Sequence, residues 1–166
     1  MTSPTTKLNN PGPVAALEGF EFSSDASRVD RSRVDRSRVY EWLAGDSYWA
    51  AGRSRSQQEA AMDASRNFGI YRTGSGEQVA YARVITDGAT FAYLCDVYVD
   101  RSVRGSGVGT ALVGGACATL DGLGLTRILL ATADAHGLYG RFGFEPLADP
   151  AIWMAKTRFP ASGAAS

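Results

Sequence analysis

Three closely spaced glycines, Gly105, Gly107 and Gly109, separate a strand-like segment from a helix-like segment. Glycine permits sharp turns and lets a ligand approach the backbone closely, because no side chain stands in the way. The first N–H groups of the following helix have no partner within the helix, and with the helix dipole they favour a bound anion. Arg101 and Arg104 add positive charge beside this loop. The stretch therefore predicts a phosphate-binding site.

The spacing of the glycines excludes two common phosphate loops. A Walker loop requires Lys followed by Ser or Thr after its last glycine, and this sequence has neither there. The dinucleotide fingerprint G-x-G-x-x-G would require a glycine at position 110, which is Thr110.

Two motifs resemble the signatures of the GNAT superfamily of N-acetyltransferases. Arg-x-x-Gly-x-Gly, from Arg104 to Gly109, follows Val97-Tyr98-Val99 and resembles the acetyl-CoA loop. The stretch from Thr132 to Phe144 ends in Leu-Tyr-x-x-Phe-Gly-Phe and resembles the second signature. The resemblance covers about residues 79 to 155. It implies an α/β fold with a mixed, mostly antiparallel sheet of six to seven strands and about four helices, and direct acetyl transfer from acetyl-CoA to a primary amine in a ternary complex.

The resemblance also implies which residues contact acetyl-CoA. The backbone of Val97 and Val99 is expected to hold the pantetheine amides, and the loop amides the pyrophosphate. Thr132 stands where many family members carry asparagine, so that contact is expected to differ. The whole expected set is Val97, Tyr98, Val99, Arg104, Gly105, Ser106, Gly107, Val108, Gly109, Thr110, Thr132, Ala135 and Tyr139.

Three residues are candidate catalysts. Tyr139 matches the tyrosine that in many family members protonates the leaving sulfur. Asp96 interrupts an apolar strand at a position where family members often carry a glutamate base. We expect burial to raise the pKa of its carboxyl group. The structural alternative is an ion pair between Asp96 and Arg83. His136 precedes Tyr139 by three residues, and imidazole titrates near neutrality, although a structural role is equally open. Asp134 is expected to cap the helix that carries Tyr139.

Aromatic residues between two expected helices are candidates for binding the acceptor. In this superfamily the first two helices and their connection lie over the acceptor site, which implies that Trp42, Tyr48 and Trp49 shape it. Filling the core is the alternative, since aromatic side chains bury large areas wherever they lie. Arg83 and Tyr93 complete the expected acceptor-binding set.

Composition limits the range of partners. Seventeen basic and seventeen acidic residues cancel, so no overall field attracts nucleic acid or a membrane, and a small amine is the expected acceptor. A protein or peptide acceptor, a non-catalytic acyl-CoA-binding module and an enzyme acting on another nucleotide are the alternatives.

Cys95 and Cys117 lie in apolar stretches without metal-ligand spacing, so we expect buried free thiols, a reducing cytoplasm, no metal and no acetyl-cysteine intermediate. A monomer or a homodimer is expected.

The hydrophobic pattern predicts the elements that position these residues. Residues 1–16 are expected to be disordered, 17–158 to form one domain and 159–166 to be a flexible tail. A tandem repeat from Ser27 to Val39 is expected to be a solvated connection. Helices are predicted from Asp35 or Ser37 to about Gly45, from Ser54 or Ser56 to Ser65, from the glycine loop to Leu120 and over 135–141. Strands are predicted over 68–72, 78–86, 90–99 and 127–132, and another from Phe142. Trp153-Met154 is a candidate for a last strand that closes the sheet.

Overall fold

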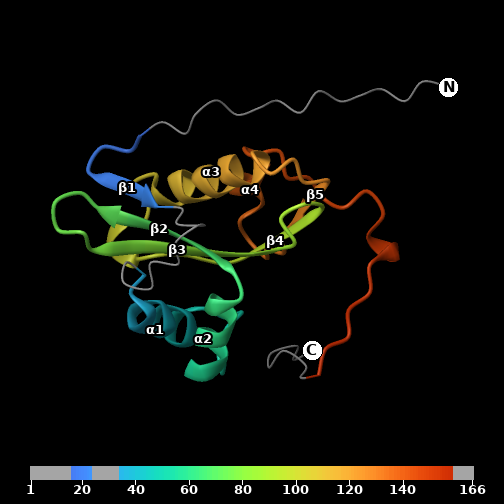
Figure 1. Ribbon diagram of the computed structural model, residues 1–166, viewed down its shortest axis with the longest axis horizontal. Coiled ribbons are helices and arrows are strands. Elements are labelled where there is room, and N and C mark those ends of the chain that lie inside the picture. Colours follow the sequence, from blue (N-terminus) through green and yellow to red (C-terminus); the bar gives the residue numbers. More distant parts are fainter. Residues whose placement is uncertain (1–15, 24–33, 159–166) are drawn as a thin grey trace.

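The computed structural model describes residues 16–23 and 34–158, which build a five-stranded sheet in the order β1-β2-β3-β4-β5 (Figure 1). The first three pairings are antiparallel, and β4 pairs with β5 in parallel. The expected disordered segment up to residue 15, the tail from 159 and most of the repeat lie outside the described residues. The strands are β1 Phe20–Ser23, β2 Arg66–Arg72, β3 Gln78–Thr86, β4 Phe91–Val99 and β5 Arg127–Leu129.

Helices α1 (Arg36–Asp46) and α2 (Arg55–Asp63) cover one face of the sheet (Figure 1). Asp35 caps α1, because its carboxylate accepts the N–H of Arg38 at 3.0 Å. Ser54 begins α2 with a capping box, in which its hydroxyl and the side chain of Gln57 each satisfy the other's backbone N–H. The polar caps predicted from the sequence therefore begin both helices. The loop between them carries Tyr48 and Trp49.

Helix α3 (Val108–Asp121) packs on the opposite face of the sheet, and α4 (His136–Gly140) follows β5 (Figure 1). The predicted apolar stripe of α3 is its buried face: Val108, Leu112, Ala116 and Leu120 are at most 1% exposed. This stripe joins β2, β3 and β4 in the main hydrophobic core. The core thereby fixes the start of α3, and with it the glycine loop, against the end of β4.

Strand β4 contributes buried residues to both faces of the sheet: Ala92 and Leu94 belong to the main core on the α3 side, and Tyr98 belongs to a second cluster with Trp42 and Leu43 of α1. Its residues alternate between half-buried and buried along the whole strand. The pairing with β3 is irregular at Asp96 and Val97: Tyr98 pairs with Tyr81 and Cys95 pairs with Arg83, which leaves these two residues opposite the single residue Ala82. This is a β-bulge. Asp96 adopts a left-handed conformation with φ of 51°, alone among the described non-glycine residues.

The sheet has fewer strands than the six to seven expected. Nothing after α4 forms a strand in the described part of the chain: Phe142–Phe144 and Trp153-Met154 lie in turns and extended backbone, interrupted by a short 3₁₀ turn, Pro150–Ile152. The sheet therefore ends at β5, which is shorter than predicted. A strand needs a hydrogen-bonded neighbour, and the C-terminal segment has no strand beside it among residues 16–23 and 34–158. Strand β1, which has no counterpart among the predicted strands, forms the other edge of the sheet.

No helix among the described residues combines the length and the apolar character needed to cross a membrane.

Candidate active site

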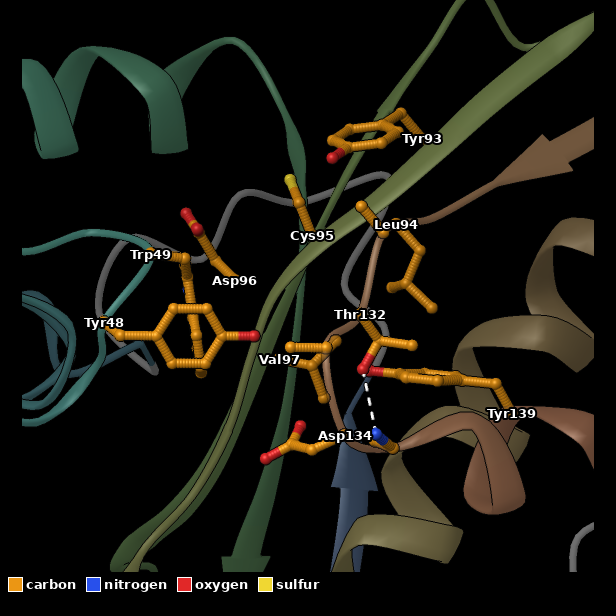
Figure 2. A pocket seen from close by; sticks show the side chains of 13 residues that line it. Tyr48, Trp49, Tyr93, Leu94, Cys95, Asp96, Val97, Thr132, Asp134 and Tyr139 are labelled. Carbon is orange, nitrogen blue, oxygen red and sulfur yellow. Dashed lines mark hydrogen bonds between the residues drawn. The ribbon is translucent and has the colours of Figure 1, made fainter. Parts of the chain in front are cut away.

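A cavity of about 470 Å³ opens between the α1–α2 loop, the bulged part of β4 and the segment that follows β5 (Figure 2). Tyr48 reaches into it from the loop, and Tyr139 reaches into it from α4 on the opposite side (Figure 2). The sequence motifs predict contact with acetyl-CoA for Tyr139 and with the acceptor for Tyr48, and the fold brings both tyrosines to one cavity. Its lining consists of Tyr48, Trp49, Tyr93, Leu94, Cys95, Asp96, Val97, Ala131, Thr132, Ala133, Asp134, Ala135 and Tyr139.

The glycine loop lies where β4 passes through a 3₁₀ turn (Arg101–Val103) into α3. Gly105 and Gly107 have φ of 78° and 88°, a region in which a side chain is strained. Gly107 caps α3 without any side-chain hydrogen bond. Within the described part of the chain, the backbone N–H groups of residues 105–107 donate to no acceptor, and those of 108–110 form the free first turn of the helix. These donors suit a pyrophosphate, so the loop fits the acetyl-CoA that the sequence motifs imply.

Arg104 and Arg101 lie beside this loop, and Asp46 at the end of α1 holds both. Arg104 donates to the backbone carbonyl of Val99 at 3.0 Å and to the Asp46 carboxylate at 3.3 Å, and its guanidinium lies over the ring of Tyr98. Asp46 also accepts a hydrogen bond from the hydroxyl of Tyr98 at 2.6 Å and pairs with Arg101. Hydrogen bonds from Arg101 and Tyr98 hold the pKa of Asp46 well below its usual range. No motif in the sequence marks Asp46 as part of the site.

Tyr139 is 8% exposed and packs edge-on against Phe144, with the ring centroids 5.9 Å apart. Burial, followed by the nearby charges of Asp134, Cys117 and Tyr48, raises the pKa of Tyr139 to about 12. The phenol therefore keeps its proton throughout the physiological pH range. This agrees with the requirement for a proton donor, and its ring is held in place by packing.

Asp96 lies at the bulge and is only 4% exposed. Its Oδ2 accepts hydrogen bonds from Arg83 at 2.8 Å and from Arg53 at 2.7 Å, and its Oδ1 lies 3.3 Å from the second terminal nitrogen of Arg53. Arg53 also donates to Gln58 of α2 at 2.6 Å. The ion pair with Arg83, the structural alternative for Asp96, is present, and Arg53 forms a second ion pair with the same carboxylate.

The expectation of a raised pKa for Asp96 was wrong. Burial alone raises the pKa, but the hydrogen bonds and positive charges of Arg53 and Arg83 outweigh it, so the pKa of Asp96 is lowered. A carboxylate with two cationic donors is a weak proton acceptor at neutral pH. Arg53 was missed from the sequence, because it precedes the Ser54 cap as one of many arginines and only the fold brings it to β4.

The expected acceptor-binding residues divide into two groups. Tyr48 and Trp49 line the cavity from the α1–α2 loop, and Tyr93 lines it from β4. The rings of Tyr48 and Trp49 pack edge-on with their centroids 5.0 Å apart, and these side chains remain 65% and 43% exposed. Trp42 is instead a core residue, stacked on Tyr98 and bonded through its indole N–H to Asp100 at 3.1 Å. Arg83 is buried beside Asp96 and lines no described cavity.

The turn before α4 differs from the predicted cap. Ala135, not Asp134, is the N-cap residue, and the hydroxyl of Thr132 accepts the N–H of Ala135 at 3.0 Å (Figure 2). This leaves the exposed Asp134 carboxylate on the cavity lining without a hydrogen bond to any described residue. His136 is also exposed and lies outside this lining, in a second cavity that shares Thr132 and Tyr139 with the first.

The two cysteines also differ in position. Cys117 is buried in α3 as expected, whereas Cys95 is only partly buried and lines the cavity (Figure 2). Burial raises the pKa of the Cys95 thiol to about 11. Since the thiolate is the nucleophile, this thiol is poorly reactive at neutral pH.

The fold and the site define an α/β protein with unpaired backbone N–H groups at the start of a helix, suited to an anionic ligand, and with a protonated tyrosine beside the same strand. The model of the acetyltransferase (GNAT) family matches residues 36–144, and the chain belongs to this family. Acetyl-CoA is the acyl donor of GNAT acetyltransferases. The resemblance noted in the two sequence motifs is thereby confirmed.

Individual relatives agree with this assignment. An acetyltransferase candidate from Gibberella zeae is 35% identical over an alignment of 119 positions. The alignment covers 60% of this chain and 66% of that protein, so the match spans just under two thirds of the curated relative. A GNAT-family acetyltransferase candidate from Xanthomonas campestris pv. campestris is 39% identical, with a TM-score of 0.76 over 86% of this chain and 95% of its own. Glucosamine-6-phosphate N-acetyltransferase from Arabidopsis thaliana shares the fold, with a TM-score of 0.57 at 16% identity. The comparison covers 86% of this chain and all of that chain.

Proposed function

We propose that the protein transfers an acetyl group from acetyl-CoA to a primary amine of a small molecule, directly and within a ternary complex. The observation that carries this proposal is the arrangement along β4, where a loop of unpaired backbone N–H groups follows the strand and the protonated Tyr139 faces its bulge. The bound donor supplies an acetyl thioester. Residues 104–110 hold its phosphates, and the backbone around Val97 and Val99 orients its amide-containing arm.

Tyr139 is the proton donor in this proposal. Its phenol, protonated at neutral pH, donates a hydrogen bond to sulfur as negative charge develops there and delivers its proton to the thiolate that leaves. The raised pKa of Cys95 disfavours prior transfer to this thiol, which supports direct attack by the amine.

Asp96 is a positioning residue in this proposal. Its ion pairs with Arg83 and Arg53 join β3, the bulge and the start of α2, and so hold the lining near Cys95 and Val97 in place. His136 is exposed beside Tyr139 and Thr132, and we assign it the role of accepting the amine proton through water.

The cavity lining favours a small, cationic acceptor. It contains no lysine or arginine, it carries the unpaired Asp134 carboxylate, and Tyr48, Trp49 and Tyr93 present aromatic rings to it. An ammonium group is attracted both to a carboxylate and to the faces of aromatic rings. The exposure of Tyr48 leaves the rim open, which is the one observation that favours the alternative of a peptide N-terminus or lysine side chain as acceptor.

Calorimetric titration of the purified protein with acetyl-CoA, with NAD and ATP as controls, tests the donor. We expect binding of acetyl-CoA alone, with a Kd in the micromolar range, about −8 kcal/mol. Release of free thiol in the presence of a panel of amines, compared with a panel of peptides, then identifies the acceptor class. Tight binding without thiol release by either panel would favour a non-catalytic module, and preferential binding of NAD or ATP would contradict the proposal.

Gly107→Val is expected to raise the Kd for acetyl-CoA by at least about 100-fold, or about 2.7 kcal/mol. A β-branched residue is strained at φ of 88°, so the loop must rearrange and its N–H groups move. Gly124→Val is the matched control, because Gly124 has φ of 66° beyond the other end of α3 and open space around it. Equal affinities of the two variants would contradict the loop assignment.

A further inference from the structure

The carboxylate of Asp46 joins the end of α1 to the segment that leads into the glycine loop. Asp46 is the last residue of α1 and immediately precedes the α1–α2 loop, residues 47–54. Its partners, Tyr98, Arg101 and Arg104, lie at the end of β4, in the 3₁₀ turn and directly after that turn. One side chain therefore connects two parts of the site that are 52 to 58 positions apart in the sequence.

The ring of Tyr98 makes this connection rigid. Tyr98 is buried, and the ring of Trp42 in α1 stacks on it with the centroids 5.2 Å apart. The guanidinium of Arg104 lies 5.4 Å from the centroid of the same ring and donates to the carbonyl of Val99 at 3.0 Å. Because Asp46 accepts the hydroxyl of Tyr98 at 2.6 Å, its carboxylate is fixed relative to β4.

Arg104 keeps hydrogen-bond donors for a further anion. It uses Nε for the carbonyl of Val99 and Nη2 for Asp46, and its Nη1 makes no hydrogen bond to any described residue. The side chains of Arg104 and Arg101 are both at least half exposed. A guanidinium has five N–H donors in a planar fork, so it can bind a carboxylate and a phosphate at the same time. A phosphate at the glycine loop can therefore bind Arg104 without displacing Asp46.

The α1–α2 loop is held by buried contacts on both sides of its two aromatic residues. The hydroxyl of Ser47 donates to the carbonyl of Leu43 at 2.6 Å and accepts the N–H of Ala50 at 3.2 Å. Ala50 itself belongs to the hydrophobic cluster between α1 and the sheet. Tyr48 and Trp49 lie between these contacts and line the first cavity. The position of the end of α1 therefore decides where the two rings lie in the cavity.

We propose that Asp46 is a positioning residue that couples the binding of acetyl-CoA to the position of Tyr48 and Trp49. Arg104 contacts the phosphates of the donor while it stays paired with Asp46, and Asp46 holds the start of the α1–α2 loop. Fixing the exposed Arg104 side chain on a phosphate removes part of the entropy cost of its pairing with Asp46, so a bound donor orders the loop. By linkage, the acceptor then binds more tightly when the donor is bound. The role of Asp46 rests on the proposed function, because the donor must bind at the glycine loop.

Hydrogen exchange of the full chain, with and without saturating coenzyme A, tests the proposal. Coenzyme A is the probe because it carries the phosphates and requires no acceptor. In the wild type we expect it to slow exchange of the backbone amides of residues 47–54 by at least about fivefold. Asp46→Ala is expected to lose this slowing while its Kd for coenzyme A, measured by calorimetry, stays within about fivefold of the wild type, because exposed ion pairs contribute little to affinity.

Glu41→Ala is the matched control. Glu41 is an exposed carboxylate on the same helix that forms no ion pair with any described residue. Alanine favours the helix in both variants, and circular dichroism establishes that each is folded. The slowing caused by coenzyme A should persist in Glu41→Ala. Direct contact of coenzyme A with the loop would slow exchange in Asp46→Ala as well, so the pair of variants separates contact from coupling.

Arg104→Lys tests the connection from the other side and leaves α1 unchanged. The lysine ammonium keeps the charge but lacks the planar fork that binds two anions at once. We expect this variant to bind coenzyme A and to lose the slowing, as Asp46→Ala does. Slowing that persists in both variants, or its absence in a wild type that binds coenzyme A, would overturn the proposal. A wild type that does not bind coenzyme A would overturn the proposed donor and this coupling with it, so the two failures are distinguishable.

Discussion

Tyr139→Phe is expected to lower kcat by about 100-fold while leaving the Kd for acetyl-CoA within about twofold. Phenylalanine keeps the ring that packs edge-on against Phe144 and removes only the hydroxyl. The loss should therefore fall on the proton that sulfur receives and not on the binding of the donor. Thiol release under saturating acetyl-CoA measures kcat, and calorimetry measures the affinity.

The pH dependence of the wild type provides a second check on Tyr139. Since its pKa is about 12, the phenol is protonated below that value and loses activity only as the pH rises toward it. No loss attributable to Tyr139 is expected between pH 6 and about 10. Tyr40→Phe is the matched control, because Tyr40 lies on α1 beside Arg55 and lines neither cavity. An unchanged kcat in Tyr139→Phe, or an equal loss in both variants, would remove Tyr139 from the reaction.

Asp96→Asn is expected to lower the free energy of unfolding at neutral pH by about 3 kcal/mol. Asparagine has the same shape and tolerates the left-handed backbone at the bulge, so the substitution removes only the negative charge. Arg83 and Arg53 would then lie beside each other without a counter-ion, and Arg83 is almost fully buried. Denaturant unfolding of both proteins measures the difference.

Acid should abolish this difference between Asp96→Asn and the wild type. The pKa of Asp96 is lowered in the folded protein, so its contribution is present above the unfolded value of about 3.9 and disappears as the pH falls through the folded value. Glu59→Gln is the control, because Glu59 forms an exposed i,i+4 pair with Arg55 and should change stability little at any pH. A loss in Asp96→Asn that persists unchanged at low pH would show that charge is not its cause.

Local sequence determined the helices, most of the strands and the glycine loop before α3. Polar caps at Asp35 and Ser54, the four-residue apolar stripe of α3 and the glycine spacing all act over a few residues, so each can be read without knowing the fold. The same holds for Tyr139, because the motif that marks it as a candidate proton donor is local. The family assignment rests on these local features, and the comparisons confirmed it.

Contacts between distant residues were decided by tertiary structure alone. The pKa of Asp96 moved down because Arg53, forty-three positions away, meets it at the bulge, and Trp42 became a core residue because Tyr98 stacks on it. The predicted final strands are not formed in the part of the chain that the structure describes, since a strand requires a hydrogen-bonded neighbour that sequence periodicity does not supply. Sequence thus determined which secondary structure each segment can form. The packing of distant segments decided which charged side chains form ion pairs and which strand edges pair.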